Sequence, residues 1–277
     1  MTAKSLLRDV LIRCMAPLSD RAYRERPRVR VISFHDIPER ARDNFRDKVR
    51  WLSRNCDVVS LAAACDRPGL DERRLNVALT FDDGFEEHRT FVAPLLTELG
   101  LPATFFVPSG SIDLSPEGAE RFAKDGLRRR GSFRFMGSSV LEELAGEPLF
   151  EVGGHTAGHV DLGQLTDEAG LTAEIVHDKA ALEQVVGRPV RWFAFPFGTP
   201  ENVSARALRA IEDAGYRAAF TIVPSFWSSG QDRYLVGRDC LSLEESDESW
   251  ERLLRGGYDA ISRMKYRRRL KVLERRR

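Results

Sequence analysis

Short apolar runs alternate with longer amphipathic stretches along the chain. The apolar runs are rich in β-branched and aromatic residues and predict strands at 29–34, 57–61, 76–81, 103–107, 149–154, 191–195, 216–223 and 234–237. Apolar residues at helical spacing predict helices at 41–55, 86–100, 166–187 and 200–215. Three of these stretches end on a glycine, the usual left-handed stop of a helix: Gly100, Gly187 and Gly215. The alternation predicts an α/β fold with a parallel sheet, and the number of strands favours a closed or nearly closed (β/α) barrel.

The pattern predicts a single barrel domain with an extension at each end. We expect an N-terminal helical extension at 1–28, the barrel at 29–243, and a C-terminal helix with a basic tail at 244–277. The segment 109–148 is the least regular part and is expected to be an insertion or a loop over one face of the barrel. No internal repeat or low-complexity linker divides the chain.

Composition limits the partners that the chain can have. The 277 residues carry a formal net charge of +1, which argues against capture of nucleic acid by the charge of the whole chain. The four cysteines form no CxxC pair, which favours a reducing compartment and a role in packing over a disulfide framework: Cys14, Cys56, Cys65 and Cys240.

The two ends of the chain bear on its location. Arg8, Asp9 and Arg13 interrupt the apolar residues near the N-terminus, so this segment does not look like a secretory signal, and we expect a cytoplasmic protein. No run approaches the roughly 18 apolar residues that cross a bilayer. Apolar residues at helical spacing near the N-terminus and the basic tail KYRRRLKVLERRR leave two interpretations open. They form a docking helix and a solvated tail, or they attach the protein weakly to the inner face of an anionic membrane.

Two adjacent carboxylates follow the strand predicted at 76–81. Asp82 and Asp83 stand where the apolar alternation ends. In (β/α) architectures the C-terminal ends of the strands gather the functional residues. Because successive side chains of a strand point to opposite sides, the two aspartates can serve different partners.

A pair of histidines follows the strand predicted at 149–154. His155 and His159 are four residues apart, so a helical turn or a tight loop would let both imidazoles reach one ion; two partly exposed helix histidines are the alternative. A carboxylate of the Asp82/Asp83 pair would complete an Asp-His-His set. Three protein ligands with an open fourth position are typical of a catalytic zinc site, and the remaining aspartate would then be free to act as a base on the water.

Two other strand ends carry candidate groups. Pro196 and Phe197 follow an aromatic run, and the backbone N–H groups of this turn could face a developing oxyanion; a core strand followed by the start of a helix is the alternative. His35 ends the first predicted strand, either as a satisfied polar group or as a proton donor to a leaving group. His88 and His177 lie in charged helical patterns and are expected on the surface.

Three motifs together resemble the polysaccharide deacetylase family with the NodB-type homology domain, carbohydrate esterase family four: TFDDG at 80–84, HTAGH at 155–159 and FAFPFG at 193–198. The resemblance covers residues 29–243. It implies a distorted (β/α) barrel of about seven parallel strands that holds a divalent metal, usually zinc, with Co²⁺ or Ni²⁺ as alternatives, and hydrolyses acetyl groups of amino sugars in glycans.

The family pattern also implies roles for individual residues. Asp82 is the general base, and the metal ligands are Asp83, His155 and His159. Thr156 matches the hydroxyl residue that steadies the loop between the histidines. The backbone N–H of Phe197, next to Pro196, contributes to the oxyanion site.

The sequence departs from the family pattern at two points. The third motif of the family commonly carries an arginine before Pro-Pro that orients the base, but Ala194 and Phe195 stand here, and Arg238 at the end of YLVGR is the predicted substitute. The late leucine-histidine motif that supplies the general acid is absent, because no histidine follows His177. SFHDI around His35 is similar to the N-terminal motif of the permuted members, which act on β-1,6-linked poly-N-acetylglucosamine. The resemblance therefore assigns the general acid to His35.

The leading hypothesis is a metal-dependent deacetylase that hydrolyses the N-acetyl group of an amino sugar. The expected cytoplasmic location favours a nucleotide-linked, lipid-linked or short glycan precursor as the substrate. Two alternatives remain open. One is a glycan-binding barrel with impaired catalysis, which the missing arginine of the third motif would allow. The other is a hydrolase of O-acetyl, formamide or cyclic amide groups.

Overall fold

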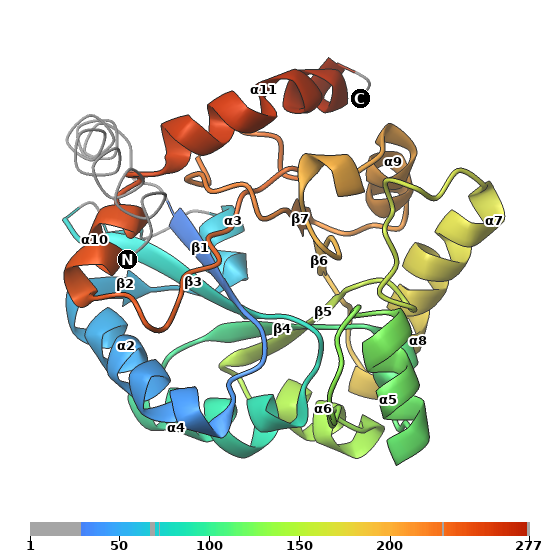
Figure 1. Ribbon diagram of the computed structural model, residues 1–277, viewed down its shortest axis with the longest axis horizontal. Coiled ribbons are helices and arrows are strands. Elements are labelled where there is room, and N and C mark those ends of the chain that lie inside the picture. Colours follow the sequence, from blue (N-terminus) through green and yellow to red (C-terminus); the bar gives the residue numbers. More distant parts are fainter. Residues whose placement is uncertain (1–28, 67–69, 72, 229, 276–277) are drawn as a thin grey trace.

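The computed structural model describes residues 29–66, 70–71, 73–228 and 230–275 (Figure 1). The predicted extension at 1–28 and Cys14 lie outside the described residues. The strands are β1 Val29–Phe34, β2 Cys56–Val58, β3 Leu75–Phe81, β4 Ala103–Val107, β5 Phe150–Gly154, β6 Trp192–Ala194 and β7 Ala218–Phe220. The helices are α2 Arg42–Asn55, α3 Leu61–Asp66, α4 Ala93–Leu99, α5 Pro116–Asp125, α6 Ser138–Gly146, α7 Glu168–Leu171, α8 Asp178–Val186, α9 Ala205–Asp213, α10 Asp247–Leu254 and α11 Asp259–Arg275, with short η1 Glu39–Ala41, η2 His88–Val92, η3 Ser109–Ser111, η4 Thr172–His177 and η5 Pro200–Asn202.

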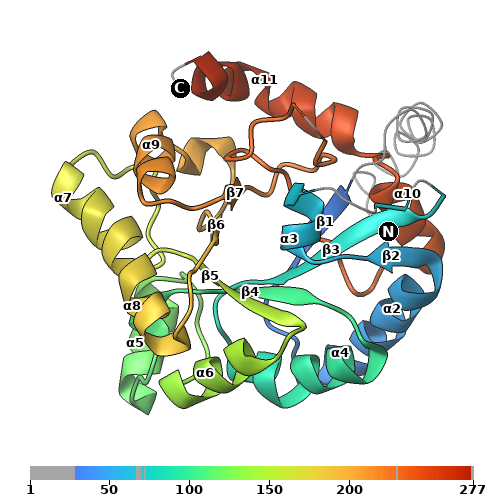
Figure 2. The same cartoon turned by 180° about the vertical axis from the view of Figure 1, so that it is seen from behind.

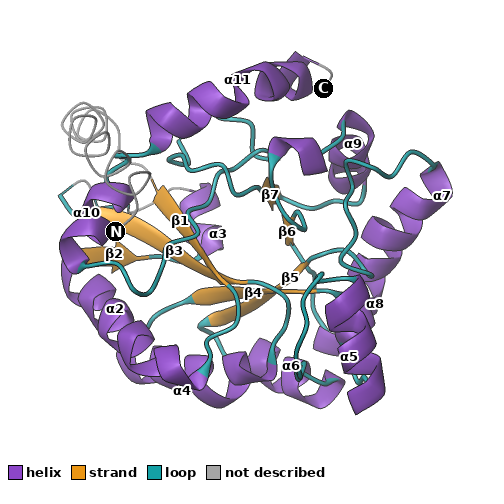
Figure 3. Ribbon diagram, in the orientation of Figure 1, coloured by secondary structure: helices purple, strands orange, loops and turns teal. Residues whose placement is uncertain are grey.

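The strands form one parallel sheet that curls into a barrel. Their order is β1-β3-β4-β5-β6-β7, with β2 paired to the first residues of β3. Figure 3 shows the strands at the centre and the helices around them. The β5 and β6 strands share only one residue pair, Gly154 with Phe193, so the ring is irregular there. The predicted single α/β domain with a distorted barrel of about seven parallel strands is confirmed.

The short segment 236–239 closes the ring between β7 and β1. The sequence predicts a strand at 234–237, but the structure has only single parallel bridges, from Val236 to Phe220 and from Asp239 to Ile32. The segment changes partner within three residues. Gly237 lies at the change, where a Cβ atom would stand 2.0 Å from the carbonyl oxygen of Val223. This close approach prevents a regular strand and still places residue 238 at the barrel mouth.

Alternating strand positions face two different cores. The ring of Phe106 on β4 lies 5.7 Å from that of Phe220 on β7, across the barrel, so these side chains fill its interior. The inward positions also include Val29, Val31, Ala78, Trp192, Ala194, Ala218 and Val236. The outward positions pack against the surrounding helices in a larger cluster. This alternation fixes which side of the barrel each residue at a strand end faces.

Several local predictions can be compared directly with the structure. The helix stops at Gly100, Gly187 and Gly215 are confirmed, since all three have left-handed φ angles of 65°, 66° and 80°. The segment 109–148 is more regular than expected, because it contains α5 and α6, and α6 packs on β5. Cys56 is buried, and none of the described cysteines forms a disulfide. Within the described residues, no helix combines the length and apolar character needed to cross a lipid bilayer.

The C-terminal helices cover one side of the barrel, as both views show (Figures 1 and 2). Arg30 on β1 points outward and is buried beneath them, where it contacts Asp239 and, at the start of α11, Asp259, each at 2.6 Å. A buried guanidinium is retained only where carboxylates pair with it. This network therefore joins α11, β1 and the closing segment that carries Arg238.

Candidate active site and metal centre

The ends of β1, β3, β5 and β6 and the closing segment surround one pocket of about 400 Å³. Seven of the eight predicted site residues line it: His35, Asp82, Asp83, His155, His159, Phe197 and Arg238. The eighth, Pro196, is buried in the adjacent turn. A larger cavity of about 600 Å³ lies beside α11, but none of the described histidines or cysteines lines it. The smaller pocket is therefore the candidate site.

Asp82 continues the inward face of β3 and is held by an arginine and a serine. Arg238 donates from Nη1 to Oδ1 and from Nη2 to Oδ2, both at 2.7 Å. The Ser33 hydroxyl donates to Oδ2 at 3.1 Å. Arg238 is itself fully buried, donates to Thr80 Oγ1 and lies over the Phe106 ring. A bidentate guanidinium fixes both the position and the plane of the carboxylate.

Asp83 leaves the strand and turns toward the histidines. Its φ angle of 74° is left-handed, as is that of the following Gly84 at 69°. A Cβ atom at residue 84 would come within 3.0 Å of Val107, so the turn needs glycine there. The two adjacent aspartates face different partners, as predicted, but the left-handed turn at Asp83 separates them and not the alternation of a strand.

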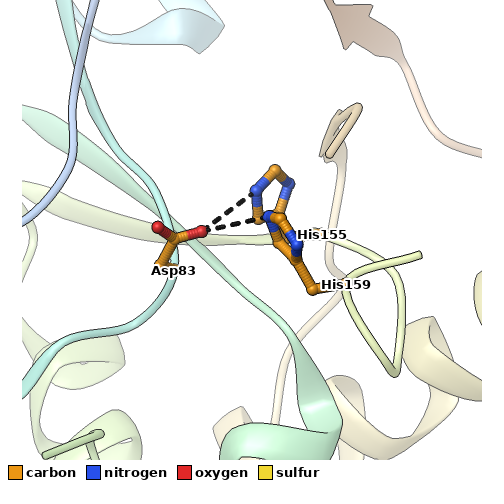
Figure 4. A group of neighbouring side chains, drawn as sticks. All are labelled: Asp83, His155 and His159. Atoms are coloured by element: carbon orange, nitrogen blue, oxygen red, sulfur yellow. Dashed lines mark ion pairs between the residues drawn. The ribbon is translucent and has the colours of Figure 1, made fainter. Parts of the chain in front are cut away.

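His155 and His159 converge on the carboxylate of Asp83 (Figure 4). Their Nε2 atoms lie 3.5 and 3.3 Å from Asp83 Oδ1. Each Nδ1 contacts a backbone carbonyl oxygen, that of Ala194 at 2.7 Å for His155 and that of Gly126 at 3.0 Å for His159. A carbonyl oxygen can only accept, so each Nδ1 carries the hydrogen. With Nδ1 as the donor to the carbonyl, the Nε2 atom of each ring points at Asp83 and is the atom that could bind a cation.

These three residues fit a divalent cation. One ligand atom from each lies within 4.8 Å of the others, and all three side chains are buried. Asp83 Oδ1 accepts no hydrogen bond of normal geometry from any described residue. A buried carboxylate oxygen without a hydrogen bond is unfavourable unless positive charge lies beside it, and a cation between Asp83 Oδ1 and the two Nε2 atoms would supply that charge. Backbone carbonyls that fix the tautomer of metal-binding histidines are the usual supporting contacts of such sites.

Both aspartates are held in the ionised form. Burial tends to raise the pKa of Asp82, but the charges of Arg238, His155 and His35 outweigh it and leave the pKa below its ordinary value. Burial also tends to raise the pKa of Asp83, and its contacts with His155 and His159 lower it well below that value. The site therefore offers two carboxylates, one paired with arginine and one facing the histidines.

Strained backbone is concentrated around this pocket. Of the six described non-glycine residues with positive φ, four belong to the predicted motifs: Asp83, Thr156, His159 and Phe197. Thr156 Oγ1 accepts a hydrogen bond from the Val160 N–H at 3.0 Å, which steadies the loop between the histidines. Such strain persists only where the surrounding contacts hold it, and it is common at functional sites.

Phe197 lies at the centre of a tight turn. Its φ is 60°, and the Gly198 N–H donates to the Pro196 carbonyl at 2.6 Å, which is the pattern of a γ-turn. The N–H of Phe197 itself donates no hydrogen bond to any described residue. The Phe197 ring packs edge-on against His159 at 4.9 Å between centroids. A free N–H beside a candidate metal ligand is suited to an oxyanion.

His35 lines the pocket, and His88 lies buried behind its backbone. The His35 side chain is 44% exposed, and its Nε2 lies 3.9 Å from Asp82 Oδ2. The prediction that His88 is on the surface is wrong, because His88 is fully buried. Its Nε2 donates to the His35 carbonyl oxygen at 3.0 Å, and burial lowers its pKa to about 4. His177 is exposed, as expected.

The burial of His88 follows from its aromatic neighbours and from the helix geometry. Its ring lies 5.5–5.8 Å from those of Phe81, Phe85 and Phe105. It starts the π-helical turn η2, in which the wider winding changes the direction of the side chains. The charged run EEHR suggests a surface position, whereas Phe85 and Phe91 on either side are the signal that could have indicated burial.

Sequence reasoning also missed an ion pair at the rim. Arg129 donates two hydrogen bonds to Asp36, at 2.7 and 3.0 Å, and both residues line the pocket. Arg129 belongs to the segment expected to be an insertion, and nothing in the spacing connects it with a residue ninety-three positions earlier. Ser33, which contacts Asp82, was missed for the same reason.

Comparisons with known proteins agree with this fold and site. The pattern of the polysaccharide deacetylase family matches residues 70–219, which is more than half of the chain. The chain is 27% identical over 159 residues to a chitin deacetylase of Pestalotiopsis sp, covering 57% of this chain and 43% of that protein. The chain spans half or less of the length of the curated relatives that it matches.

Solved structures share the architecture. A polysaccharide deacetylase from Bacillus cereus, BC0361, superposes with a TM-score of 0.66 at 20% identity, covering 82% of this chain and 69% of that one. IcaB from Ammonifex degensii superposes with a TM-score of 0.63 at 20% identity, covering 83% and 97%. At this identity the likeness supports the fold alone. From the family match, the chain belongs to the polysaccharide deacetylase family.

Proposed function

We propose that the protein is a metal-dependent hydrolase that removes the N-acetyl group from an amino sugar of a glycan or glycan precursor. The single observation that carries this proposal is the division of the two adjacent aspartates. Asp82 is held by Arg238, while Asp83 faces His155 and His159. The name of the chitin deacetylase relative supports an N-acetylated saccharide as the substrate class.

A divalent cation fits between Asp83, His155 and His159 and would supply a Lewis acid and a water molecule of lowered pKa. Zinc is the proposed ion, with Co²⁺ or Ni²⁺ as alternatives, because an Asp-His-His set accepts several divalent metals. The cation is not needed to hold the side chains in place, since backbone carbonyls already orient both imidazoles.

The remaining residues act on protons and on the developing oxyanion. Asp82 is ionised, so it can accept the proton of the attacking water. The free N–H of Phe197 is placed to donate to the oxygen of the acetyl carbonyl as negative charge develops there. His35 lies close to Asp82 and is partly exposed, so it can donate a proton to the departing amine. Arg238 positions Asp82 and takes no part in proton transfer.

With His35 as the acid, the proposal would group the chain with the permuted members of the family. The distance of 3.9 Å between His35 and Asp82 supports this choice. His88 adds support, because it fixes the backbone of His35. No other described histidine besides the two candidate ligands lines the pocket.

The proposed function is tested with protein loaded with one equivalent of Zn²⁺. Acetate release is measured from N-acetylglucosamine oligomers and from nucleotide-linked and lipid-linked N-acetylglucosamine. Release of acetate that stops on chelation and returns with Zn²⁺ supports the proposal. Bound metal without hydrolysis of any of these substrates would favour a glycan-binding barrel. Formate release, or release only from O-acetyl esters, would assign a different bond.

The proposal includes weak association with the inner face of the membrane. Helix α11 carries seven basic and two acidic residues, and at its surface Met264 is 74% exposed. Basic residues gain about 1 kcal/mol each near an anionic lipid surface, and the cytoplasmic leaflet is the anionic one. Sedimentation with vesicles of phosphatidylglycerol should exceed that with phosphatidylcholine and should fall in Arg267→Gln/Arg268→Gln. Equal sedimentation with both lipids would exclude this location.

A further inference from the structure

The loop after α5 forms part of the pocket rim. His159 Nδ1 donates to the Gly126 carbonyl oxygen at 3.0 Å, which ties the start of the loop to a candidate metal ligand. Leu127 is buried and lines the pocket. Arg129 is held by Asp36 through two hydrogen bonds on the opposite side of the pocket. The backbone on both sides of Arg128 is therefore fixed.

Arg128 lies at the centre of this loop and turns toward Phe197. Its φ is 56°, a left-handed value that a non-glycine residue adopts only when its neighbours hold it there. Its guanidinium carbon lies 4.3 Å from the centroid of the Phe197 ring, and that ring contacts His159 at 4.9 Å. Only one aromatic ring therefore separates this cation from the candidate metal centre.

Arg128 differs from the two arginines that line the pocket, Arg129 and Arg238, because it is not paired with a carboxylate in the described part of the chain. Arg238 is bound to Asp82, and Arg129 is bound to Asp36. Among the residues that the structure describes, no carboxylate forms an ion pair with Arg128. Arg128 is exposed to solvent, although its guanidinium lies over the Phe197 ring. A ligand could therefore neutralise the charge of Arg128, and the guanidinium keeps donors for a bidentate contact with an oxyanion.

We propose that Arg128 binds a phosphate ester carried by the N-acetylated sugar, so that the enzyme prefers phosphate-linked precursors over neutral glycans. This inference rests on the proposed function and specifies its substrate class. The guanidinium fork matches the geometry of phosphate oxygens, and its stacking on Phe197 holds it in place at the pocket edge. A nucleotide-linked and a lipid-linked sugar both present this group.

The test compares substrates that differ only in the phosphate. Acetate release by the Zn²⁺-loaded protein is measured from N-acetylglucosamine 1-phosphate and from methyl N-acetylglucosaminide. Uridine diphosphate N-acetylglucosamine and a short polyprenyl diphosphate N-acetylglucosamine distinguish the nucleotide source from the lipid source. Arg128→Gln should lower kcat/KM for phosphate-linked substrates by roughly tenfold to hundredfold, through KM, and leave the neutral glycoside within about twofold. Arg128→Lys should retain part of the preference.

Arg130→Gln is the matched control. Arg130 is exposed in the same loop, and its substitution removes the same charge as Arg128→Gln. An equal effect of both variants on kcat/KM would show that the preference for phosphate depends on the net charge of the loop, and it would overturn the assignment of Arg128. No preference of the wild-type protein for phosphate, or an unchanged preference in Arg128→Gln, would also overturn it while the proposed function stands.

A binding measurement separates the failure of this inference from the failure of the proposed function. Calorimetry with N-acetylglucosamine 1-phosphate and the methyl glycoside needs no turnover. If no substrate releases acetate, the proposed function fails. Tighter binding of the phosphate in the wild-type protein than in Arg128→Gln would still support the anion site, and equal binding would refute it.

Discussion

Arg238 binds both carboxylate oxygens of Asp82, with two N···O distances of 2.7 Å, from a segment 156 residues later in the chain. It occupies the mouth of the barrel because the closing segment turns residue 238 inward and residue 239 outward. The buried pair of Arg30 with Asp239 fixes the other side of the same segment. Arg238 therefore makes the contact with Asp82 that the resemblance led us to expect of a substitute for the arginine of the third motif.

Removal of Arg238 should affect both stability and the pH dependence of activity. Arg238→Gln leaves the Asp82 carboxylate buried without its cation, so its pKa should rise and the ionised base should be lost at a higher pH. The acid limb of kcat/KM against pH should therefore move to higher pH. The free energy of unfolding at pH 7 should fall by about 3–5 kcal/mol, as for other broken buried ion pairs.

The same pair makes stability depend on pH in the wild-type protein. The pKa of Asp82 is depressed in the folded state. Its contribution to the free energy of unfolding is therefore present above the ordinary carboxyl pKa and is lost as pH falls through the pKa of the folded state. Denaturant unfolding of the wild-type protein and of Arg238→Gln between pH 7 and pH 3 measures this dependence of stability on pH.

The kinetic experiment has its own contradicting outcome. An acid limb of kcat/KM that stays at the same pH in Arg238→Gln would show that Arg238 does not control the pKa of Asp82.

His35 should matter most when the leaving group needs a proton. His35→Gln should lower kcat for an N-acetylated sugar by about 100-fold or more, the usual contribution of a general acid. The loss should be much smaller on 4-nitrophenyl acetate, because its leaving group departs without a proton. Steady-state kinetics on both substrates tests this, with the exposed His177→Gln as control. A similar loss on both substrates would contradict the role of His35 as acid.

The burial of His88 predicts a second dependence of stability on pH, which an exposed histidine would not produce. Its pKa in the folded protein is about 4, below the ordinary 6.5, because burial disfavours the charged ring. The unfolded chain therefore takes up a proton near pH 6.5 that the folded protein does not take up until about pH 4. This lowers the free energy of unfolding by roughly 3 kcal/mol in total as pH falls through that window.

The free energy of unfolding of His88→Phe should lack this pH-dependent contribution. The wild-type protein should lose more stability than the variant between pH 7 and pH 4.5, as measured by urea unfolding at each pH. The variant should also lose activity, because the His35 carbonyl loses its donor. The exposed His177→Phe should follow the wild-type pH dependence, and a His88→Phe curve parallel to the wild type would contradict the buried, neutral state.

The fold was largely predictable because its signals are local. Apolar runs located all seven strands to within two residues at most ends, and left-handed glycines marked the ends of three helices. The last predicted strand was less regular, because Gly237 packs against the Val223 carbonyl. Close approach of two distant backbones leaves no periodic signal in the sequence.

The site shows the same division between local and distant relationships. Asp82, Asp83, His155 and His159 follow strands within short motifs, so pattern and resemblance placed them correctly at one pocket. The pairing of Asp36 with Arg129 and the burial of His88 depend on how separate elements pack. The roles of the site residues stay predictions, although their positions are consistent with them.

The central claim is that Asp83 holds the metal and Asp82 accepts the proton, and one measurement tests both parts. Bound Zn²⁺ per chain and acetate release are determined for Asp82→Asn and Asp83→Asn, with the exposed Asp43→Asn as control. Asp82→Asn should keep its metal and lose acetate release, whereas Asp83→Asn should lose both. Turnover retained in Asp82→Asn, or a full complement of tightly bound metal in Asp83→Asn, would contradict the account.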